Sequence, residues 1–478
     1  MQNFTSLYSP RFPTVLVYML QATEYQIGPY VAWVNRTHDF NTVMQRRTLD
    51  RTKVARLLLL TIRLGIVLQI ACGLVLIYLG QWRQLTGGVY FGLAVVAAYP
   101  LVWAYAPALL LLIGRQLIIE PREQRLVVES DKIFAAHRGV KIAIAGSYGK
   151  TTMKELLATV LAEGKKIAAT PANKNVATSH AHYARRLRGD EDVLIIEYGE
   201  GAPGDVARFA RLTHPTHAII TGLAPAHLDQ YKTLEAAGRD IFSVAGSVSA
   251  DQVYVNHQSP TVDPFIRPGF KLFDTHQALG WRVEKIQTGL DGTSFILKKG
   301  AKKVQMRSDL IGRHQVSYLA LVAALALQLG LSEKQVQTGI AKTKPFEHRM
   351  QPYLLGGAWV IDDTYNGNLE GIRAGTQLLK DLTAQRKIYV TPGLVDQGEA
   401  TDRVHIEVGE LIAAARPDLV VLMQNSATDY IQQGLANANF TGRVQIEPVP
   451  LEFYTNLNHF VAAGDLVVMQ NDWTDNYA

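Results

Sequence analysis

The chain has 478 residues, a length that predicts two or three domains. Hydrophobic residues make up 48% and charged residues 19%, a composition that is ordinary for a folded protein, and a mean hydropathy of +0.03 indicates membrane segments. The one cysteine, Cys72, excludes a disulfide framework and a cysteine zinc site. Because Cys72 lies in an apolar run, we expect its thiol to be buried.

The N-terminal part of the chain is basic, and the net charge of the whole chain is +6. A basic cluster consists of Arg46, Arg47, Arg51, Lys53 and Arg56. Such a cluster can bind nucleic acid. Its position just before an apolar run instead favours an anionic membrane surface, so we expect a lipid bilayer as partner and no nucleic acid.

Before this cluster, residues 14–34 are rich in Leu, Val, Tyr and Trp but contain Glu24 and Pro29. We predict a helix at the membrane surface, broken near Gly28 and Pro29. A third membrane crossing is the alternative.

Two long apolar segments follow the cluster. Residues 57–79 contain one charge, Arg63, and residues 89–113 contain none. Each segment is long enough to cross a hydrocarbon core of about 30 Å, and the short link between them predicts a transmembrane helical hairpin. Two buried helices of a soluble domain are the alternative.

Basic residues also follow the hairpin, at Arg115, Arg122 and Arg125. The positive-inside rule therefore places both ends of the hairpin in the cytoplasm. We predict a multi-pass protein of the cell membrane, with residues 1–128 as the membrane anchor and the following domains in the cytoplasm.

After residue 128 the pattern changes to short apolar strands that alternate with helical stretches. The predicted strands are residues 142–145, 193–196, 218–220 and 253–256. This alternation predicts a parallel sheet covered by helices. Residues 270–307 predict short hairpin-like strands, and residues 315–329 predict an apolar helix.

A phosphate-binding loop lies between the first of these strands and a helical stretch, residues 153–161. Its predicted nucleotide-binding residues are Gly146, Ser147, Tyr148, Gly149, Lys150, Thr151 and Thr152. Glycines let the backbone approach phosphates, and the N–H groups of the helix start point toward them. Lys150 can reach the terminal phosphates, and the Thr151 hydroxyl can ligate Mg²⁺. The spacing is GxxGK[ST] rather than GxxxxGK[ST], so a chance glycine turn is the alternative.

A second α/β unit starts near residue 346. Its predicted strands are residues 358–361, 387–391, 419–423 and 466–469. The predicted fold class is therefore α/β: a membrane hairpin, a central parallel-sheet P-loop ATPase domain at 129–345, and a Rossmann-like domain at 346–478.

Seven further short motifs follow the phosphate loop. They are residues 170–175 (TPANKN), 194–197 (LIIE), 203–205 (PGD), 224–229 (APAHLD), 312–314 (GRH), 348–350 (HRM) and 362–368 (DDTYNGN). In this order they resemble the Mur ligase family, most closely its D-alanyl-D-alanine-adding branch, over residues 141–464. The resemblance implies a Mur ligase central domain and C-terminal domain. It also implies that ATP converts a carboxylate to an acyl phosphate, which an amine then displaces to give an amide.

ATP and Mg²⁺ are the cofactors that the resemblance implies. The resemblance implies that Glu197 and His227 are Mg²⁺ ligands, in addition to Thr151. Asn173 and Asn175 match asparagines near the γ-phosphate.

Arg349 matches the arginine that reaches ATP from the domain junction, and the predicted catalytic residues are Arg349, Lys150 and His227. Asp363 and Asn366 match residues near the nucleotide and the incoming amine, with Tyr365 between them. Tyr318 can stack on adenine or merely pack, since the family's His-Asn-x-x-Asn reads His314-Gln315-Val316-Ser317-Tyr318 here.

Two further features depart from the family. The carbamoylated lysine that binds its second Mg²⁺ has no counterpart, and Asp240 is a candidate replacement. The membrane segment also stands where the family has a small UDP-sugar-binding domain.

We predict a membrane-tethered, ATP-dependent amide ligase of peptidoglycan precursor synthesis. It would join an amino acid or dipeptide to a carboxylate acceptor, such as a lipid- or UDP-linked peptide. The alternatives are a ligase of the poly-γ-glutamate type and a non-catalytic scaffold.

Overall fold

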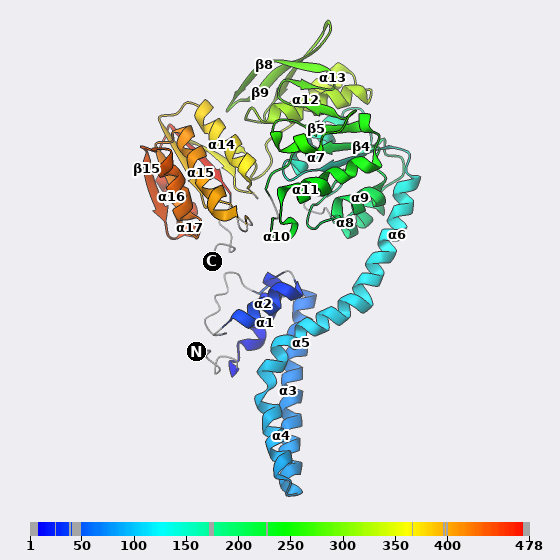
Figure 1. Cartoon of the computed structure of the whole chain (residues 1–478), viewed down its shortest axis with the longest axis vertical. Coiled ribbons are helices and arrows are strands. Elements are labelled where there is room, and N and C mark those ends of the chain that lie inside the picture. The colour runs from blue at the N-terminus through cyan, green and yellow to red at the C-terminus, as the bar shows by residue number, and fades with distance from the viewer. Residues whose placement is uncertain are drawn as a thin grey trace. The chain divides into compact units, whose positions relative to one another are not determined.

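The structure is a computed structural model of the chain (Figure 1). It describes residues 8–23, 25–37, 40, 49–171, 176–225, 228–365, 367–394, 397 and 400–471. The chain forms two compact units, Met1–Arg125 and Leu126–Ala478.

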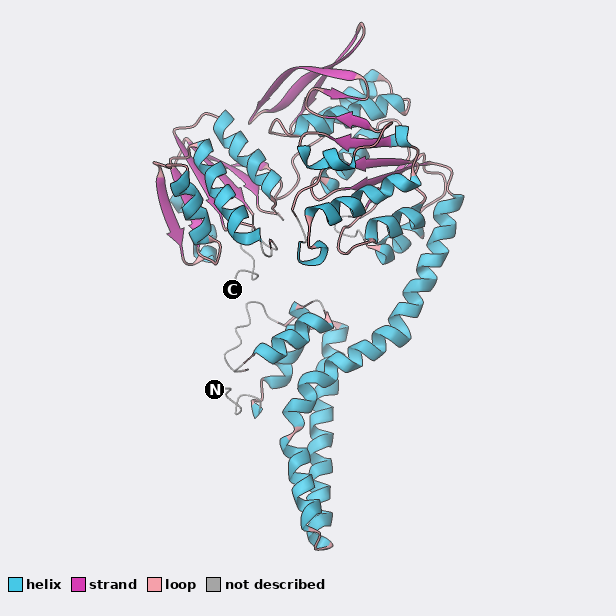
Figure 2. Cartoon of the chain, in the orientation of Figure 1, coloured by secondary structure: helices cyan, strands magenta, loops and turns pink. Residues whose placement is uncertain are grey.

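The first unit is helical (Figure 2). Its helices are α1 (Phe12–Ala22), α2 (Ile27–Arg36), α3 (Lys53–Trp82), α4 (Thr86–Ala97) and α5 (Tyr99–Gly114), which continues through a π-helical turn (Arg115–Ile119) into α6 (Glu120–Ala136). Its core joins α1, α3 and α5 through side chains such as Leu16, Ile62 and Ala104, which are 0%, 0% and 4% exposed.

Glycines bring α3 and α4 together as a helical hairpin. A Cβ atom added at Gly73 would lie 2.9 Å from the carbonyl oxygen of Gly92, and one added at Gly80 would lie 2.7 Å from the nitrogen of Val89. Only glycine allows the two backbones to lie so close, as in many helix pairs of membranes.

Three details of this unit differ from the sequence predictions. The apolar segment 89–113 is two helices, because the helix breaks at Ala98, two residues before Pro100. The break between α1 and α2 falls at residues 23–26, since Pro29 is tolerated in the first turn of α2. Cys72 is exposed rather than buried.

Two helical runs in the described part of the chain have the length and apolar composition of membrane spans. They are Lys53–Trp82 and the continuous run Tyr99–Ala136. Only 11% and 18% of their most apolar windows are buried in the structure. The apolar surface of these helices is therefore mostly exposed, unlike that of core helices in a soluble domain.

The second unit contains two sheets. The larger has the strand order β10-β9-β8-β7-β6-β5-β4-β1-β3-β2. Its strands are β1 (Val140–Ala145), β2 (Ile167–Ala169), β3 (Val193–Glu197), β4 (His217–Ile220), β5 (Val253–Asn256), β6 (Lys271–Phe273), β7 (Gln277–Ala278), β8 (Trp281–Gly289), β9 (Gly292–Lys299) and β10 (Lys302–Ser308). Strands β1 to β6 are parallel, and β7 to β10 form antiparallel hairpins.

Helices cover both faces of the larger sheet (Figure 2). They are α7 (Lys150–Leu161), α8 (Ala177–Ala184), α9 (Asp205–Thr213), α10 (Leu228–Tyr231), α11 (Leu234–Ile241), α12 (Gln315–Gln328) and α13 (Glu333–Ala341), with short 3₁₀ turns at Phe242–Ser247, Ala250–Gln252 and Pro260–Phe265. Helices α7, α12 and α13 cover one face, and α6, α8, α9 and α11 the other. Strand β1 lies between β3 and β4, where the strand order reverses, so the loop after β1 opens at the point where such sheets bind ligands.

The smaller sheet has the order β11-β12-β16-β13-β14-β15 and is parallel except for β11. Its strands are β11 (Gln351–Leu355), β12 (Ala358–Asp363), β13 (Arg386–Thr391), β14 (Leu419–Met423), β15 (Arg443–Glu447) and β16 (Asp465–Gln470). Its helices are α14 (Leu369–Asp381), α15 (Thr401–Ala415), α16 (Thr428–Asn437), α17 (Pro450–Thr455) and α18 (Leu457–Phe460). The predicted α/β class with parallel sheets is confirmed.

Candidate active site

The loop between β1 and α7 has the backbone of a phosphate cradle. Gly146 and Gly149 have φ of +145° and +72°, where residues with a Cβ are strained. A Cβ atom at Gly149 would lie 2.1 Å from the hydroxyl oxygen of Tyr318. The N–H of Ser147 donates to the carbonyl of Gly222 at 3.0 Å. Helix α7 begins directly at Lys150, so its free N–H groups lie at the loop.

Lys150 bridges the loop to a carboxylate that the sequence analysis did not select. Its Nζ donates to the carbonyl of Gly146 at 2.6 Å and to Glu200 Oε1 at 2.7 Å. The two side chains are only 11% and 7% exposed. The ammonium is thus held at the mouth of the loop by a buried ion pair, and a phosphate placed there would compete with Glu200 for it.

Thr151 and Glu197 meet, as the resemblance implied. The Thr151 hydroxyl donates to Glu197 Oε1 at 2.8 Å. On the other side, Lys154 Nζ lies 3.1 Å from Glu197 Oε2, and both side chains are at most 5% exposed. Neither Lys154 Nζ nor Glu197 Oε2 has a hydrogen-bond partner of good geometry among the described residues. A buried carboxylate oxygen without such a partner, beside a threonine hydroxyl, suits a hard cation such as Mg²⁺.

A cavity of about 410 Å³ adjoins the loop. It brings together predicted site residues from both sheets, and these are Tyr148, Gly149, Thr152, Tyr318, Arg349 and Asp363. Tyr318 is 5% exposed and donates to the carbonyl of Thr221 at 3.3 Å. Its ring therefore packs under the loop and offers only a small part of its surface to the cavity.

His314 and Gln315 also line this cavity. Burial lowers the pKa of His314 to about 4, so the ring is neutral near pH 7 and one ring nitrogen is an acceptor. Gln315 Nε2 lies 3.0 Å from His314 Nε2 and donates to it. The Gln315 Oε1 atom is buried and has no partner among the described residues. It is therefore available to a ligand group that donates a hydrogen bond.

Arg349 and Asp363 form the part of the cavity that comes from the smaller sheet. The guanidinium of Arg349 lies 4.5 Å from the centre of the Tyr365 ring, a cation–π arrangement. Asp363 accepts from the backbone N–H of Met350 at 3.1 Å and from Gln470 at 2.7 Å. Burial raises the pKa of Asp363 to about 7.

Four predicted site residues lie outside the described residues: Asn173, Asn175, His227 and Asn366. Among the described residues, no group of three or more His, Cys, Asp or Glu side chains is placed to hold a metal ion. The structure also argues against Asp240 as a Mg²⁺ ligand. Its oxygens accept from the N–H of Gly204 at 3.0 Å and the hydroxyl of Tyr231 at 2.7 Å, so it fixes the start of α9 instead.

Glu200 and Lys154 are the site residues that sequence reasoning missed. Glu200 follows the same strand as Glu197, so its position at the carboxyl edge of the sheet was a usable signal. Lys154 is three residues after Thr151, and this spacing places both on one face of α7. A lysine in the middle of a helix is nevertheless normally solvated, and only the fold shows that this one is 0% exposed.

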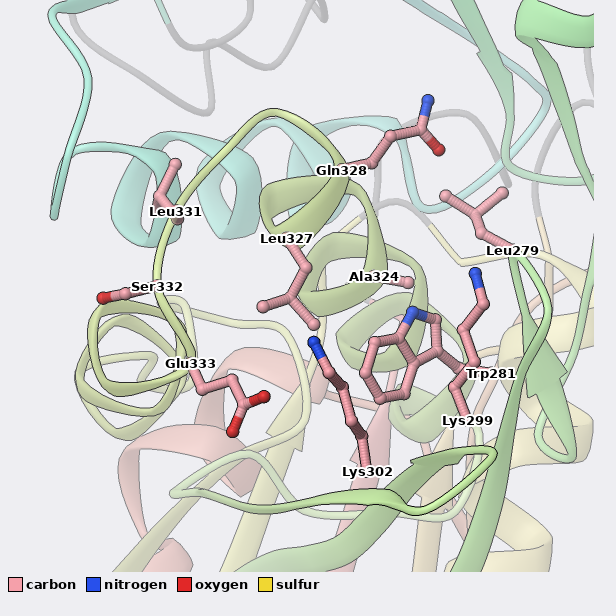
Figure 3. Close-up of a pocket in the computed structure, with 10 residues that line it drawn as sticks. All are labelled: Leu279, Trp281, Lys299, Lys302, Ala324, Leu327, Gln328, Leu331, Ser332 and Glu333. Carbon is pink, nitrogen blue, oxygen red and sulfur yellow. The ribbon is translucent and has the colours of Figure 1, made fainter.

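A second cavity, of about 490 Å³, lies between the hairpins β7–β10 and the ends of α12 and α13 (Figure 3). Trp281, Lys299 and Lys302 line it, with Lys299 Nζ 5.9 Å from the indole centre. None of the predicted site residues lines it. The cavity beside the phosphate loop is therefore the candidate active site.

The model of the Mur ligase middle domain matches residues 144–326, the stretch that carries the phosphate loop and Glu197. This stretch of the chain is therefore a Mur ligase middle domain. It is 27% identical to the UDP-N-acetylmuramoyl-tripeptide–D-alanyl-D-alanine ligase of Escherichia coli (strain K12) over 290 residues, which cover 59% of this chain and 63% of the relative. The ligase of the same name from Synechocystis sp. is 30% identical over 305 residues, 61% and 64% of the two chains. The chain thus spans less than two thirds of the length of these relatives.

Solved structures agree on the fold. MurF from Acinetobacter baumannii superposes with a TM-score of 0.64 at 19% identity, over 73% of this chain and 77% of the other. MurF from Thermotoga maritima, solved in complex with ADP, gives the same TM-score and identity over 73% and 80%. The predicted Mur ligase fold of the second unit is confirmed.

Proposed function

We propose that this chain is a ligase of the Mur type, which uses ATP to join an amine to a carboxylate. The observation that carries the proposal is the pairing of the phosphate loop with Glu197. Lys150 and Thr151 lie beside two buried carboxylates, and the adjoining cavity holds Arg349 and the half-buried Asp363. This set provides cations for phosphate oxygens and oxygen ligands for Mg²⁺ around one cavity.

In the proposed reaction, an oxygen of the acceptor carboxylate attacks the γ-phosphorus of ATP. The bond from that phosphorus to the β,γ-bridging oxygen breaks, ADP leaves, and an acyl phosphate forms. The amine nitrogen then attacks the acyl carbon, the C–O bond to phosphate breaks, and the amine loses a proton.

The residues of the chain act by position and charge. The N–H groups at the start of α7 and the Lys150 ammonium hold the phosphates and stabilise the charge on the transferred group. Thr151 and Glu197 would hold Mg²⁺, which would offset negative charge on the phosphate oxygens. Arg349 has a fixed positive charge at the wall of the cavity and would bind phosphate oxygens by its bidentate fork.

Gln315 supports adenine as the base. Its free Oε1 is an acceptor, and its Nε2 is fixed on the neutral His314 ring. An acceptor in this place suits the exocyclic amino group of adenine, whereas guanine would present a carbonyl oxygen on the same edge and repel it. We therefore expect ATP to bind in preference to GTP.

The membrane anchor is also part of the proposal. Large apolar side chains cover the outside of α3 to α5, and examples are Leu57, Val67, Leu68, Phe91 and Leu101, each more than 60% exposed. Tyr78, Trp82 and Tyr90 gather toward the hairpin tip and are 67%, 70% and 73% exposed, as in an aromatic belt at a membrane interface. A soluble unit of this size does not leave so much apolar surface in water.

For substrates we propose a peptidoglycan precursor peptide as carboxylate acceptor and an amino acid or dipeptide such as D-alanyl-D-alanine as amine. The names of the relatives support this class. The hairpin favours an acceptor at the membrane surface, because it would hold the enzyme close to that surface.

The test is ATP turnover by the full chain in detergent, with candidate amines and acceptors and the product identified by mass spectrometry. Lys150→Ala should reduce turnover by at least about a hundredfold, because the ammonium stabilises the transferred phosphoryl group. Its melting temperature should fall, because the variant leaves the buried Glu200 carboxylate without its cation, so turnover is compared at a temperature where the variant is folded. Near-normal turnover by the folded variant, or ATP binding without turnover under every substrate pair, would contradict a catalytic role.

A further inference from the structure

Strand β15 ends the smaller sheet and leaves one side open (Figure 1). Among the described residues it pairs with β14 alone, in parallel. The N–H of Arg443 donates to Asp418, and the carbonyl of Glu447 accepts from the N–H of Gln424, so these two residues turn their backbone toward the β14 side. Because backbone groups alternate along a strand, Val444 and Ile446 turn their N–H and C=O groups to the open edge.

Natural edge strands are normally protected by an inward charge, a lysine or a bulge. Here the two residues whose backbone groups face the open edge are apolar. They are Val444 and Ile446, which are 36% and 41% exposed. In the register, Val444 lies beside Val420 and Ile446 beside Leu422, which belong to the core under α14 to α16. The apolar face of the sheet therefore continues to its open edge.

The sequence of the strand, Arg443-Val-Gln-Ile-Glu447, is complementary to itself when reversed. An antiparallel copy centred on Gln445 places each Arg443 opposite a Glu447 and each Val444 opposite an Ile446. Within the described residues, neither Arg443 nor Glu447 takes part in an ion pair. Opposite charges directly across a ladder stabilise the pairing.

This register also satisfies the backbone. Val444 and Ile446 both face outward, so each opposed pair exchanges two hydrogen bonds, while Gln445 forms the close, non-bonded pair at the centre. Shifting the register by two residues in one direction brings Pro448, which has no N–H, opposite Val444. A two-residue shift the other way removes both ion pairs.

We propose that two copies of this chain dimerise through β15. The two β15 strands pair in antiparallel fashion with Gln445 at the centre, so the two smaller sheets become one continuous sheet. The dimer is independent of the ligase proposal, because β15 carries no residue of the candidate active site.

The first test is the mass of the full chain in detergent, by light scattering across a dilution series. The unchanged chain should be dimeric at high concentration. Arg443→Glu and Glu447→Arg should each weaken the dimer at least about tenfold by placing like charges opposite one another. The double variant, with both charges exchanged, should restore it. A single-chain mass at every concentration, or a dimer unaffected by either charge reversal, would overturn the proposal.

A second test does not depend on affinity. In a Cys72→Ala background, Gln445→Cys should form an inter-chain disulfide under mild oxidation, since Cα atoms of such a pair lie about 4.5 Å apart. Lys380→Cys, exposed on α14, is the matched control. Cross-linking of Gln445→Cys no faster than the control would contradict the proposed junction.

Discussion

At the scale of single residues, the phosphate loop is bounded by two lysine–carboxylate pairs. Lys150 pairs with Glu200, and Lys154 lies against Glu197. Each ammonium stabilises the carboxylate beside it, because a buried carboxylate without a cation would be an uncompensated charge. Binding of a phosphate and a metal ion has to rearrange both pairs, because the phosphate attracts the Lys150 ammonium and the metal ion attracts the Glu197 carboxylate.

Glu200→Gln is therefore expected to tighten ATP binding roughly fivefold, about 1 kcal/mol, since the Lys150 ammonium no longer has to leave a carboxylate. Glu200→Asp is the matched control that keeps the charge. Calorimetry with ATP and Mg²⁺ measures the effect. Weaker ATP binding by Glu200→Gln would show that the carboxylate assists the bound state instead of competing with it.

Asp363 gives a prediction on pH. Its pKa of about 7 in the folded chain lies above the usual 3.8, so the folded state holds the proton more tightly than the unfolded state does. The stabilisation is complete below about pH 4 and is lost as the pH rises through about 7. The melting temperature of the chain should fall between about pH 4 and 7, and Asp363→Asn should flatten that dependence. Equal slopes for the two chains would contradict the raised pKa.

The sequence identified Lys150, Thr151 and Glu197 because motif spacing and strand ends are local features. It did not identify Glu200 as the partner of Lys150, or the burial of Lys154, because both depend on how β3 lies against α7. For Asp240 the sequence suggested a role in metal binding that the contacts in the fold oppose. Its carboxylate looked available in the sequence, but the fold uses it to hold α9 and Tyr231.

At the scale of elements, the central strands were predictable because apolar, β-branched runs mark strands buried on both faces. The strands that the sequence analysis missed lack such an apolar, β-branched run. Strand β2 has three residues, and β15 alternates polar and apolar residues at an open edge. The helix break at Ala98 was missed because Pro100 lies within a segment of uniform hydropathy, where composition alone does not show a kink.

The α3–α4 hairpin depends on glycine contacts. In Gly73→Leu the new Cβ would lie 2.5 Å from Val96 Cγ2, so the helices must separate. We expect destabilisation of about 1–3 kcal/mol, as for overpacking in a core. Gly87→Leu is the control, since nothing lies within 4 Å of an added Cβ there. Thermal unfolding of the helical signal in detergent compares the two, and equal melting temperatures would contradict close packing at Gly73.

At the scale of the whole molecule, the topology of the hairpin decides whether the proposed ligase can use cytoplasmic ATP. Basic residues flank both ends of the hairpin, and its turn carries only Arg83. By the positive-inside rule we expect the ends in the cytoplasm and the turn outside. Gln84 lies in this turn with φ of +53° and is exposed, which makes it a position for a label on the outer side.

Single cysteines at Arg56, Gln84 and Arg115, in a Cys72→Ala chain, test this topology in intact cells. An impermeant thiol reagent should label only the cysteine at position 84, while all three should react after the cells are opened. Because α3 and the α4–α5 pair run between these positions, labelling at 84 alone requires two crossings. Labelling at 56 or 115 from outside would place the phosphate loop on the side without ATP and contradict the membrane-tethered ligase. Protection of all three positions would instead mean that the hairpin does not cross the membrane.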